Sequence, residues 1–320
     1  IGIAGIGKQA TISQAYINTS ALPVTIRSVL SSNPARTTAS PVPVTIAAGG
    51  SQNFVFQYTC AAEETITDTI RFVIDQPCAD TIAIVTRARG GSGSVSASQK
   101  LSYGIVPECG SKTDSAVIYN NGSLPIDLIE FLGIVGPDSS LFICSNPDIV
   151  KAQQLSPGEK RTLYVVFNPS ASTDGIKTAY LKVLAKVNDT LVTIVTELRG
   201  ERRTSLPINP QNLVFGAVSI SASSTQSVTL VNTGAERLTV RTIRMKNGAG
   251  SVFSVTSVPA SPMSIDPGTS IDLTIVFRPQ DQLYYQDSII IELDKPCTEE
   301  RVMAVSGTGR VVIDVTLKAP

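Results

Sequence analysis

The sequence VNTGAERLTV at residues 231–240 decides the fold, because two earlier stretches repeat its pattern. They read INTSALPVTI at residues 17–26 and YNNGSLPIDL at residues 119–128. In each stretch an apolar run ends in an Asn followed by small polar residues, and an alternating apolar strand then begins. Asn and Gly readily adopt the left-handed backbone that a turn between strands needs. The pattern therefore predicts the same strand–turn–strand unit three times.

Two further anchors follow each copy. The first is a turn that contains a glycine, at Gly49, Gly158 and Gly268. Nine residues after each of these glycines an aromatic residue closes a strand. The second is a glycine that closes the unit, at Gly90, Gly200 and Gly309. Matching glycines lie about 110 residues apart, which is the signature of a tandem array of one unit.

The repeat divides the chain into three domains, at residues 1–92, 93–202 and 203–310, and residues 311–320 are predicted to begin a further domain. Each unit holds about seven short alternating strands, which is typical of an immunoglobulin-like sandwich. No segment has a convincing helical period. The sequence therefore predicts an all-β protein of three tandem immunoglobulin-like β-sandwich domains in a linear array.

The first unit begins within its own motif. Gly104 stands sixteen residues before Asn120, and the same offset from Asn18 leads to Gly2, so the strand that precedes Gly104 has no counterpart in the first unit. Two explanations stay open: the chain is a piece of a longer one, or a neighbouring chain donates the strand. Between the first two units, residues 89–94 are rich in Gly and Ser and predict a flexible linker.

The composition excludes several classes of function. Lys and Arg number 26, as do Asp and Glu, so no basic field exists to hold a nucleic acid. No apolar run is long enough to predict a membrane-spanning segment. The chain contains no His, so the usual Ser-His-Asp and Cys-His arrangements cannot form and the commonest metal ligand is absent. We therefore predict no enzyme, no cofactor, and no catalytic, cofactor-binding or metal-binding residues.

The five cysteines form no C-x-x-C pair. Cys109 follows the first strand of the second unit and Cys144 enters the fourth, so strands that alternate up and down would bring both to one end. This predicts a disulfide between Cys109 and Cys144. Cys60 and Cys78 lie at opposite ends of their strands, roughly 25 Å apart, beyond the reach of a disulfide. Two alternatives stay open: Cys78 and Cys297 occupy the same turn facing the preceding domain, which would allow a bridge between domains, or some cysteines are buried thiols.

Other candidate residues favour plain structural roles. The adjacent carboxylates Glu63–Glu64 and Glu299–Glu300 fall in turns, where solvation is expected rather than acid–base catalysis. Neighbouring residues of a strand point to opposite faces, so one ring of Tyr284–Tyr285 should lie in the core and the other in solvent. Asn-x-Ser/Thr triplets, which could carry a glycan, begin at Asn18, Asn121 and Asn188.

The third unit resembles the ASH/Hydin-type immunoglobulin-like domain, which is related to the major sperm protein fold. The residues that carry this resemblance are Asn232, Thr233, Gly234, Pro267, Gly268, Phe277, Pro279, Gly307 and Gly309. The second unit keeps Asn120, Gly122, Pro157, Gly158, Phe167, Pro169 and Gly200. The first unit departs most, with Ala48–Gly49 in place of Pro-Gly and Cys60 in place of the proline.

Bacterial arrays of this kind resemble the choice-of-anchor D repeats of large secreted or surface proteins. The resemblance implies a structural or adhesive segment of a larger exported bacterial protein, forming a stalk, surface layer or fibre. It implies an extracellular or cell-surface location, or alternatively the periplasm, and protein partners that include copies of the chain itself. Two alternatives are a binding module for a peptide or glycan and an accessory region of a large secreted enzyme. No catalytic residue of the family carries over to this chain.

Overall fold

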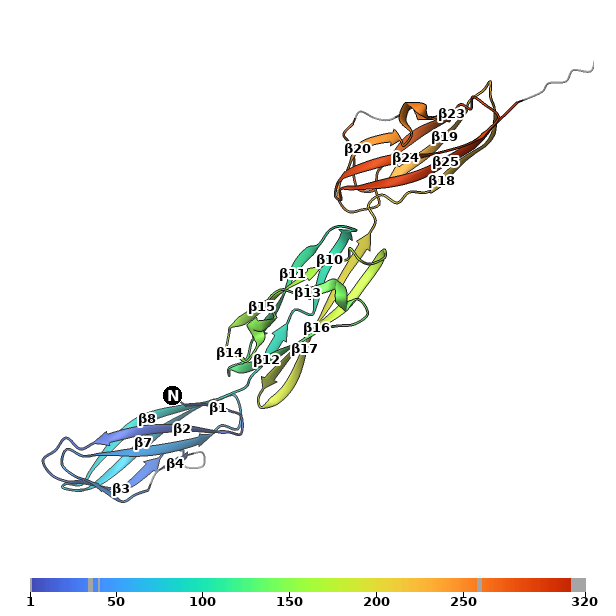
Figure 1. Cartoon of the computed structure of the whole chain (residues 1–320). Coiled ribbons are helices and arrows are strands. Elements are labelled where there is room, and N and C mark those ends of the chain that lie inside the picture. The colour runs from blue at the N-terminus through green and yellow to red at the C-terminus, as the bar shows by residue number, and fades with distance from the viewer. Residues whose placement is uncertain (1, 34–36, 40, 258–260, 312–320) are drawn as a thin grey trace, which may run out of the picture.

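The computed structural model describes residues 2–33, 37–39, 41–257 and 261–311. Three β-sandwiches follow one another along a rod, in blue, green and orange from the N-terminus (Figure 1). This confirms the prediction of an all-β chain of tandem immunoglobulin-like sandwiches. Of the further domain predicted at 311–320, all but Val311 lies outside the described residues.

The second domain shows the complete pattern. One sheet has the strand order β10-β17-β16-β12-β14 and the other has the order β13-β15-β11-β9. The elements are β9 Val95–Ala97, β10 Lys100–Pro107, β11 Lys112–Asn120, β12 Ile126–Val135, η1 Ser139–Leu141, β13 Phe142–Cys144, η2 Pro147–Val150, β14 Gln153–Leu155, β15 Lys160–Phe167, β16 Gly175–Val187 and β17 Thr190–Arg203.

The outer domains repeat this architecture with sheets β1-β8-β7-β3-β5 and β2-β6-β4 in the first domain, and β18-β25-β24-β20-β22 and β19-β23-β21 in the third. The first domain contains β1 Gly2–Gly5, β2 Gln9–Ile17, β3 Val24–Ser31, β4 Thr37–Ala39, β5 Val44–Ile46, β6 Ser51–Thr59, β7 Thr65–Gln76 and β8 Asp80–Gly91. The third contains β18 Asn212–Ser219, β19 Ser224–Val231, β20 Leu238–Met245, η3 Gly248–Gly250, β21 Phe253–Val255, β22 Met263–Ile265, β23 Ser270–Phe277, β24 Tyr284–Lys295 and β25 Glu299–Arg310.

The first strand of each domain pairs in parallel with the last. β1 pairs with β8, β10 with β17 and β18 with β25, whereas the other pairings are antiparallel. In the second domain β9 also covers the edge of β11. Among the described residues no strand covers the corresponding edge of β2 in the first domain. The first strand of the first domain is the short β1, which pairs with β8 from Gly2 to Gly5.

The repeated Asn holds each turn from inside. The Asn120 amide is buried; its Nδ2 donates to the backbone oxygens of Leu124 and Leu155 at 2.9 and 2.8 Å, and its Oδ1 accepts from the Gly122 N–H at 2.9 Å. Asn18 and Asn232 make the equivalent bonds. A smaller apolar side chain would leave these buried carbonyls without a donor, which explains why the same residue type stands at all three positions.

The closing glycines mark two different positions. Cβ atoms added at Gly200 and Gly307 would lie 2.3 and 2.5 Å from the rings of Phe167 and Phe277. Cβ atoms added at Gly90 and Gly309 would instead lie 2.1 Å from a backbone oxygen, that of Ala62 and Asp281 respectively. The structural partner of Gly200 is therefore Gly307, not Gly309 as the spacing predicted. Repeat spacing is the weaker guide here because Gly200 lies 33 residues after Phe167, whereas Gly307 lies 30 residues after Phe277.

Each sandwich has its own hydrophobic core. The buried apolar residues of the three cores fall within residues 10–88, 101–198 and 206–305. In the second and third domains a trio of rings fills the middle, with Phe142 stacked on Phe167 and Phe253 stacked on Phe277. The domain boundaries predicted at residues 92 and 202 fall between these ranges and stay predictions.

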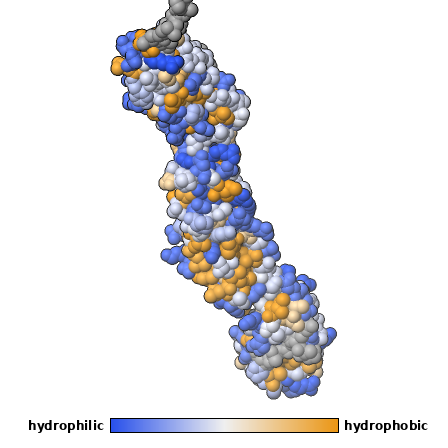
Figure 2. All heavy atoms as spheres, turned by 90° about the vertical axis from the view of Figure 1, so that its right-hand side faces the viewer, coloured by the Kyte–Doolittle hydropathy of each residue, from blue (hydrophilic) through white to orange (hydrophobic). Residues whose placement is uncertain are grey.

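The surface is mixed in polarity along the rod. Apolar residues gather over part of the middle domain in the view of Figure 2. The strands β16 and β17 expose Ile176, Tyr180, Leu191, Val192 and Val195. Among the described residues, no helix has the length and apolar character needed to cross a bilayer.

Candidate functional site at the domain junctions

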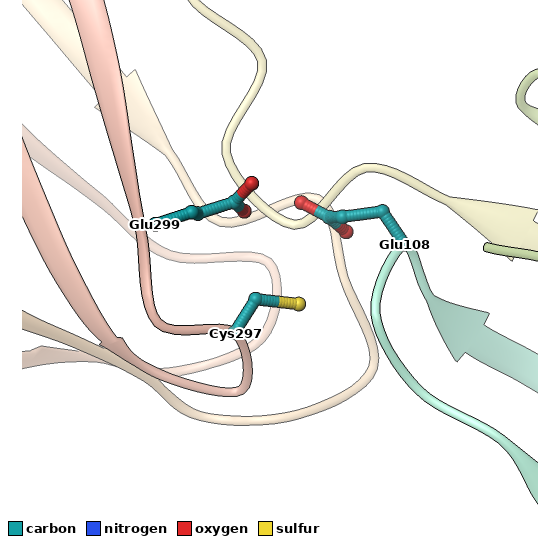
Figure 3. A group of neighbouring side chains, drawn as sticks. All are labelled: Glu108, Cys297 and Glu299. Carbon is teal, nitrogen blue, oxygen red and sulfur yellow. The ribbon is translucent and has the colours of Figure 1, made fainter. Parts of the chain in front are cut away.

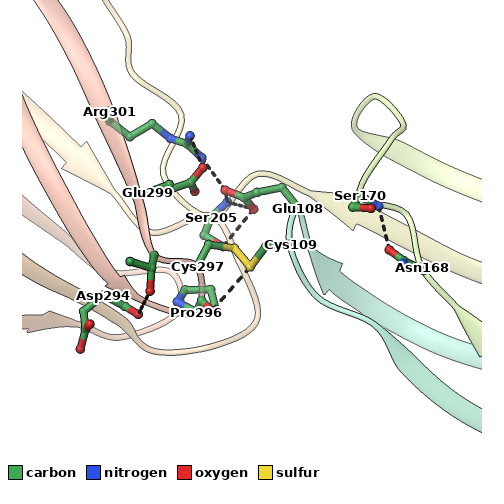
Figure 4. Close-up of a disulfide and its surroundings, with 11 residues drawn as sticks. Glu108, Cys109, Asn168, Ser170, Ser205, Asp294, Pro296, Cys297, Glu299 and Arg301 are labelled. Carbon is green, nitrogen blue, oxygen red and sulfur yellow. Dashed lines mark hydrogen bonds and ion pairs between the residues drawn. A yellow bond between two sulfur atoms is a disulfide. The ribbon is translucent and has the colours of Figure 1, made fainter.

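A disulfide joins the second domain to the third (Figure 4). Cys109 lies in the loop after β10, Cys297 lies in the turn between β24 and β25, and their Cα atoms are 5.7 Å apart. The predicted partner of Cys109, Cys144, is instead a free thiol at the end of β13, where it packs against the core of its own domain. Cys109 stands beyond the end of its strand and points to the neighbouring domain. The alternative of a bridge between domains is therefore the one that this structure contains.

A buried carboxylate lies beside the disulfide. Glu108 is 8% exposed, and its Oε2 accepts from the backbone N–H of Ser205 at 3.0 Å. The guanidinium of Arg301 pairs with the other carboxylate oxygen, and Arg301 Nε donates to the backbone oxygen of Leu206 at 3.1 Å. One charged pair thus ties together the end of β10, the connecting segment and β25. A buried charge needs such a partner, because desolvation without one is costly.

Glu299 completes this cluster (Figure 3). The ligand atoms of Glu108, Cys297 and Glu299 lie within 4.8 Å of one another, which is close enough to surround a metal ion. The Cys297 sulfur is already bonded to Cys109, however, and Arg301 lies 2.7 Å from the Glu299 carboxylate. In this oxidised state the cluster offers no thiolate, and a guanidinium occupies the place of the cation. The geometry fits an ion-pair network rather than a metal site.

The protonation of Glu299 responds to this environment. Burial raises the pKa of the Glu299 carboxyl, and the hydrogen bond with Glu108 raises it further, while the charge of Arg301 acts in the opposite direction. The sequence predicted a solvated turn for Glu299–Glu300. That prediction describes Glu300, which is exposed, but not Glu299, because the docked second domain removes part of its water.

The connecting segment is held from both sides. Arg202 forms an ion pair with Asp174, and the Thr204 N–H donates to Asp174 at 3.0 Å. From the third domain, Thr233 Oγ1 donates to the Thr204 carbonyl oxygen at 2.7 Å. The residues between the two domains therefore have little freedom to swing.

The junction of the first and second domains uses the same elements with different chemistry. Lys8, in the loop after β1, lies 3.6 Å from Asp189 in the turn between β16 and β17. Both side chains are more than two-thirds exposed. The pKa of the Asp189 carboxyl is lowered, first by a hydrogen bond from Lys186 and then by the charges of Lys186 and Lys8. A surface pair of this kind contributes little to stability because water and salt screen it.

The predicted flexible linker at residues 89–94 is largely ordered. β8 continues to Gly91, and the Ser92 N–H donates to Ser123 Oγ at 3.0 Å. The amide of Asn188 then accepts from the Gly93 N–H at 2.6 Å and donates to the Gly93 oxygen at 3.0 Å. The glycines therefore allow close contact with the second domain rather than freedom. An open cleft of about 350 Å³ remains beside this linker, lined by Ile6, Lys8, Ser92, Leu124, Lys186 and Asp189.

Of the remaining predicted residues, Glu63 and Asn188 take part in the first junction. Tyr284 is 61% exposed, whereas the Tyr285 ring packs edge-on against Phe277, as the alternation of a strand predicts. Glu63 bonds to Ser92 and Ser123, so it contributes to the first junction. The amide of Asn18 is buried in its turn and that of Asn188 bonds to the linker, so neither is free to carry a glycan.

Sequence reasoning missed Glu108, Ser205 and Arg301. None of them belongs to a repeated motif, because each meets its partner only across a domain boundary. The one local signal was the position of Glu108, next to a cysteine that was itself a candidate for a disulfide.

Comparison with known proteins supports the family resemblance for one domain. Residues 204–308 match the family model of the HYDIN/CFA65/VesB-like, Ig-like domain. A comparison with curated protein sequences gives no match.

Several solved structures are similar to parts of the chain. A Porphyromonas gingivalis protein of unknown function is 17% identical, covers 67% of this chain and 99% of its own, and has a TM-score of 0.30. The ASH/PapD-like domain 7 of human CEP192 is 15% identical, covers 35% of this chain and 87% of its own, and has a TM-score of 0.27. The periplasmic chaperone SfaE is 15% identical, covers 68% of this chain and 100% of its own, and has a TM-score of 0.28.

Similarities of this size carry no functional argument. The family model does carry one for the fold, since it spans almost all of the third sandwich, from the connecting segment to β25. The third sandwich is therefore similar to the HYDIN/CFA65/VesB-like, Ig-like domain over residues 204–308.

Proposed function

We propose that the chain is a structural segment of a larger exported bacterial protein, in which the tandem sandwiches act as a stiff spacer. The observation that carries this proposal is the junction of the second and third domains. A disulfide and a buried ion pair close it, and the connecting segment between them is bonded on both sides. Two domains joined in this way move as one body, which suits a stalk, surface layer or fibre.

The same junction supports the proposed location. Disulfides persist in oxidising compartments and are rare in the cytosol. We therefore place the chain outside the cell or at the cell surface, with the periplasm as the alternative. In this role its partners are proteins, including copies of itself.

A catalytic role is not part of the proposal. The chain has no His, and the cluster of Glu108, Cys297 and Glu299 is occupied by Arg301 and by the disulfide. Glu108 and Glu299 face each other across a domain junction instead of an open cleft.

Small-angle X-ray scattering on the intact chain tests the spacer role. We expect a pair-distance distribution of an elongated particle, with the second and third domains at a fixed separation that does not change with salt. A distribution that requires freely jointed domains would overturn the proposal. Negative-stain electron microscopy of the native material then separates the forms: fibres or a lattice indicate an assembly subunit, and single rods indicate a spacer arm.

The exposed apolar strand pair of the second domain favours one alternative, a module that binds another protein. Tyr180, Leu191 and Val195 stand in solvent on β16 and β17, where a single-domain protein usually carries polar residues. Replacing Tyr180 and Val195 by Ser should abolish partner capture if this face binds a peptide or protein. Rod shape would remain unchanged, so the two roles can be distinguished.

A further inference from the structure

The outer tip of the first domain repeats the cysteine turn of the third. Residues 75–80 read DQPCAD and residues 294–299 read DKPCTE. The strand registers that flank the two turns also agree, since Ile74 pairs with Asp80 as Leu293 pairs with Glu299. Cys78 therefore occupies the place on its sandwich that Cys297 occupies on the third.

The two turns differ in what covers them. Cys297 is 3% exposed and bonded to the second domain, whereas Cys78 is an exposed free thiol. The neighbours of Cys297 that the second domain also covers are Pro296, Glu299 and Arg301, and their counterparts in the first domain, Pro77, Asp80 and Ile82, are all exposed. The surface that serves as an interface in the third domain is thus open in the first.

The corresponding surface makes the same kind of contact at both domain junctions of the chain. The turn between β16 and β17 contacts the loop after β1, through Asp189 and Lys8. The turn between β24 and β25 contacts the loop after β10, through Cys297 and Cys109. In both cases the last hairpin of one domain meets the first-strand loop of the domain before it. The same geometry leaves the hairpin that carries Cys78 facing outward along the rod (Figure 1).

We propose that Cys78 is a docking cysteine, which closes a disulfide with a further immunoglobulin-like domain of the same repeat type. That domain presents a cysteine in the loop after its first strand, as Cys109 is presented here. The three loops of this chain do not supply it: residues 5–8 and 219–222 contain no cysteine, and Cys109 is already bonded. The partner is therefore a domain outside the three of this chain.

Formation of the new disulfide needs an oxidant, and glutathione disulfide supplies it. The two thiols lose two electrons and two protons as the new S–S bond forms, and glutathione disulfide takes them up to give two molecules of glutathione. This inference rests on the proposed role of the chain as a rod segment, because it extends the rod by one junction.

The three first-strand loops make the same tight turn, which supplies a probe. The backbone N–H groups of Lys8, Gly110 and Ala222 each donate three residues back, to Gly5, Pro107 and Ser219, at 2.9, 3.0 and 3.0 Å. Ser221 is therefore the counterpart of Cys109 in the third domain, at the opposite tip of the rod. The intact chain carrying Ser221→Cys provides a repeat domain with a cysteine in the required loop.

The experiment measures the rate at which disulfides link chains head to tail in a glutathione redox buffer. Non-reducing gels separate the linked products. We expect the Ser221→Cys chain to form a ladder of disulfide-linked oligomers at least ~10-fold faster than a Ser270→Cys control, because docking orients the two thiols. Ser270 is exposed on the same domain but lies at the start of β23, far from that loop. Adding Cys78→Ser to the Ser221→Cys chain should abolish the ladder.

Equal crosslinking rates for the two cysteines would overturn the proposal, since collision alone would then explain the bond. A ladder that survives Cys78→Ser would also overturn it. Thermal melts confirm that each variant is folded before its rate is used. Scattering of the unlinked chain reports the rod role separately, so failure of the docking does not count as failure of the spacer.

Discussion

The two junctions of this rod use the same elements and reach different strengths. Between the second and third domains, Glu108 forms a partly buried ion pair with Arg301, and a disulfide joins Cys109 to Cys297. Between the first and second, the counterparts of Glu108 and Cys109 are Ile6 and Gly7, and the direct charge contact is the exposed pair of Lys8 and Asp189. Topology therefore fixes where neighbouring domains touch, and a few side chains decide how firmly they do so.

Stiffness can therefore vary along an array of similar domains. A cleft remains open at the first junction, while the second is closed by side chains from three segments. We expect bending to concentrate at the junction of the first and second domains, and the second and third domains to behave as one unit. Changes at the second junction should accordingly have the larger effects.

Removal of the disulfide should have the largest effect. The double change Cys109→Ser and Cys297→Ser opens a link between residues separated by 188 positions. Such a crosslink typically contributes about 2–5 kcal/mol by restricting the unfolded chain. In calorimetry, we expect the joint transition of the second and third domains to split into two, with the third melting earlier. Cys78→Ser is the control, and an unchanged melting profile of the double variant would contradict the comparison.

Removal of the buried carboxylate should rank second. Glu108→Gln leaves Arg301 with Glu299 as its remaining carboxylate partner and weakens the bond from the Ser205 N–H. A hydrogen bond to a charged group is worth about 1.5–3 kcal/mol, so the third domain should lose a similar amount in denaturant unfolding. Glu300→Gln, which changes an exposed neighbouring carboxylate, should have no measurable effect. Equal losses of stability for the two variants would show that removal of any negative charge destabilises the third domain, whether or not the carboxylate is buried at the junction.

Alanine substitutions at two glycines test how closely the two connecting segments are packed. A Cβ at Gly122 would lie 2.3 Å from the backbone nitrogen of Ser94, whereas a Cβ at Gly234 would lie 3.1 Å from Ser205 Oγ. Backbone cannot yield as a side chain can, so Gly122→Ala should cost about 1–3 kcal/mol and Gly234→Ala less. Chemical denaturation measures both, and faster proteolysis near residue 93 should accompany the first. The reverse order would show that the close approach of the Ser94 backbone does not limit substitution at Gly122.

Acid should act on the two junctions in opposite directions. The pKa of Glu299 is raised in the folded protein, so its contribution favours folding at low pH and is lost as the pH rises through that pKa. The pKa of Asp189 is lowered, so its contribution is present at neutral pH and is lost as the pH falls. Glu299→Gln should therefore flatten the pH dependence of third-domain unfolding above the ordinary pKa of a glutamate. An unchanged pH profile in this variant would rule out a role for Glu299 at the junction.

The smallest effect is expected at the exposed ion pair. Asp189→Asn removes the partner of Lys8 and Lys186, both of which keep their contact with water. Global stability should stay within experimental error, because solvent screens such pairs. The spread of angles between the first and second domains, measured by scattering in low salt, should widen slightly and converge with wild type in high salt. A large loss of stability would show that the first junction contributes as much to stability as the second.

Much of the fold could be read from local patterns. The Asn turn was predictable because its amide closes bonds within one domain, to residues four positions on and to a facing strand. Alternation also separated Tyr284 from Tyr285. The candidate site was less accessible: Glu108 and Arg301 are distant in sequence and meet only after two finished domains dock. The linker was misjudged for a related reason, since composition records the freedom of an isolated segment and not the surface it lies on.

The repeated sandwich, its turns and the absence of His-based chemistry could be derived from the residues alone, because they depend on residue type and on spacing within one unit. The pairing of Cys109 with Cys297, the partial burial of Glu299 and the match of Gly200 with Gly307 became evident only from the folded chain. These outcomes depend on which surfaces face each other once the domains are in line. Local periodicity carries no information on that contact, so a disulfide between domains could be proposed from the sequence but not assigned.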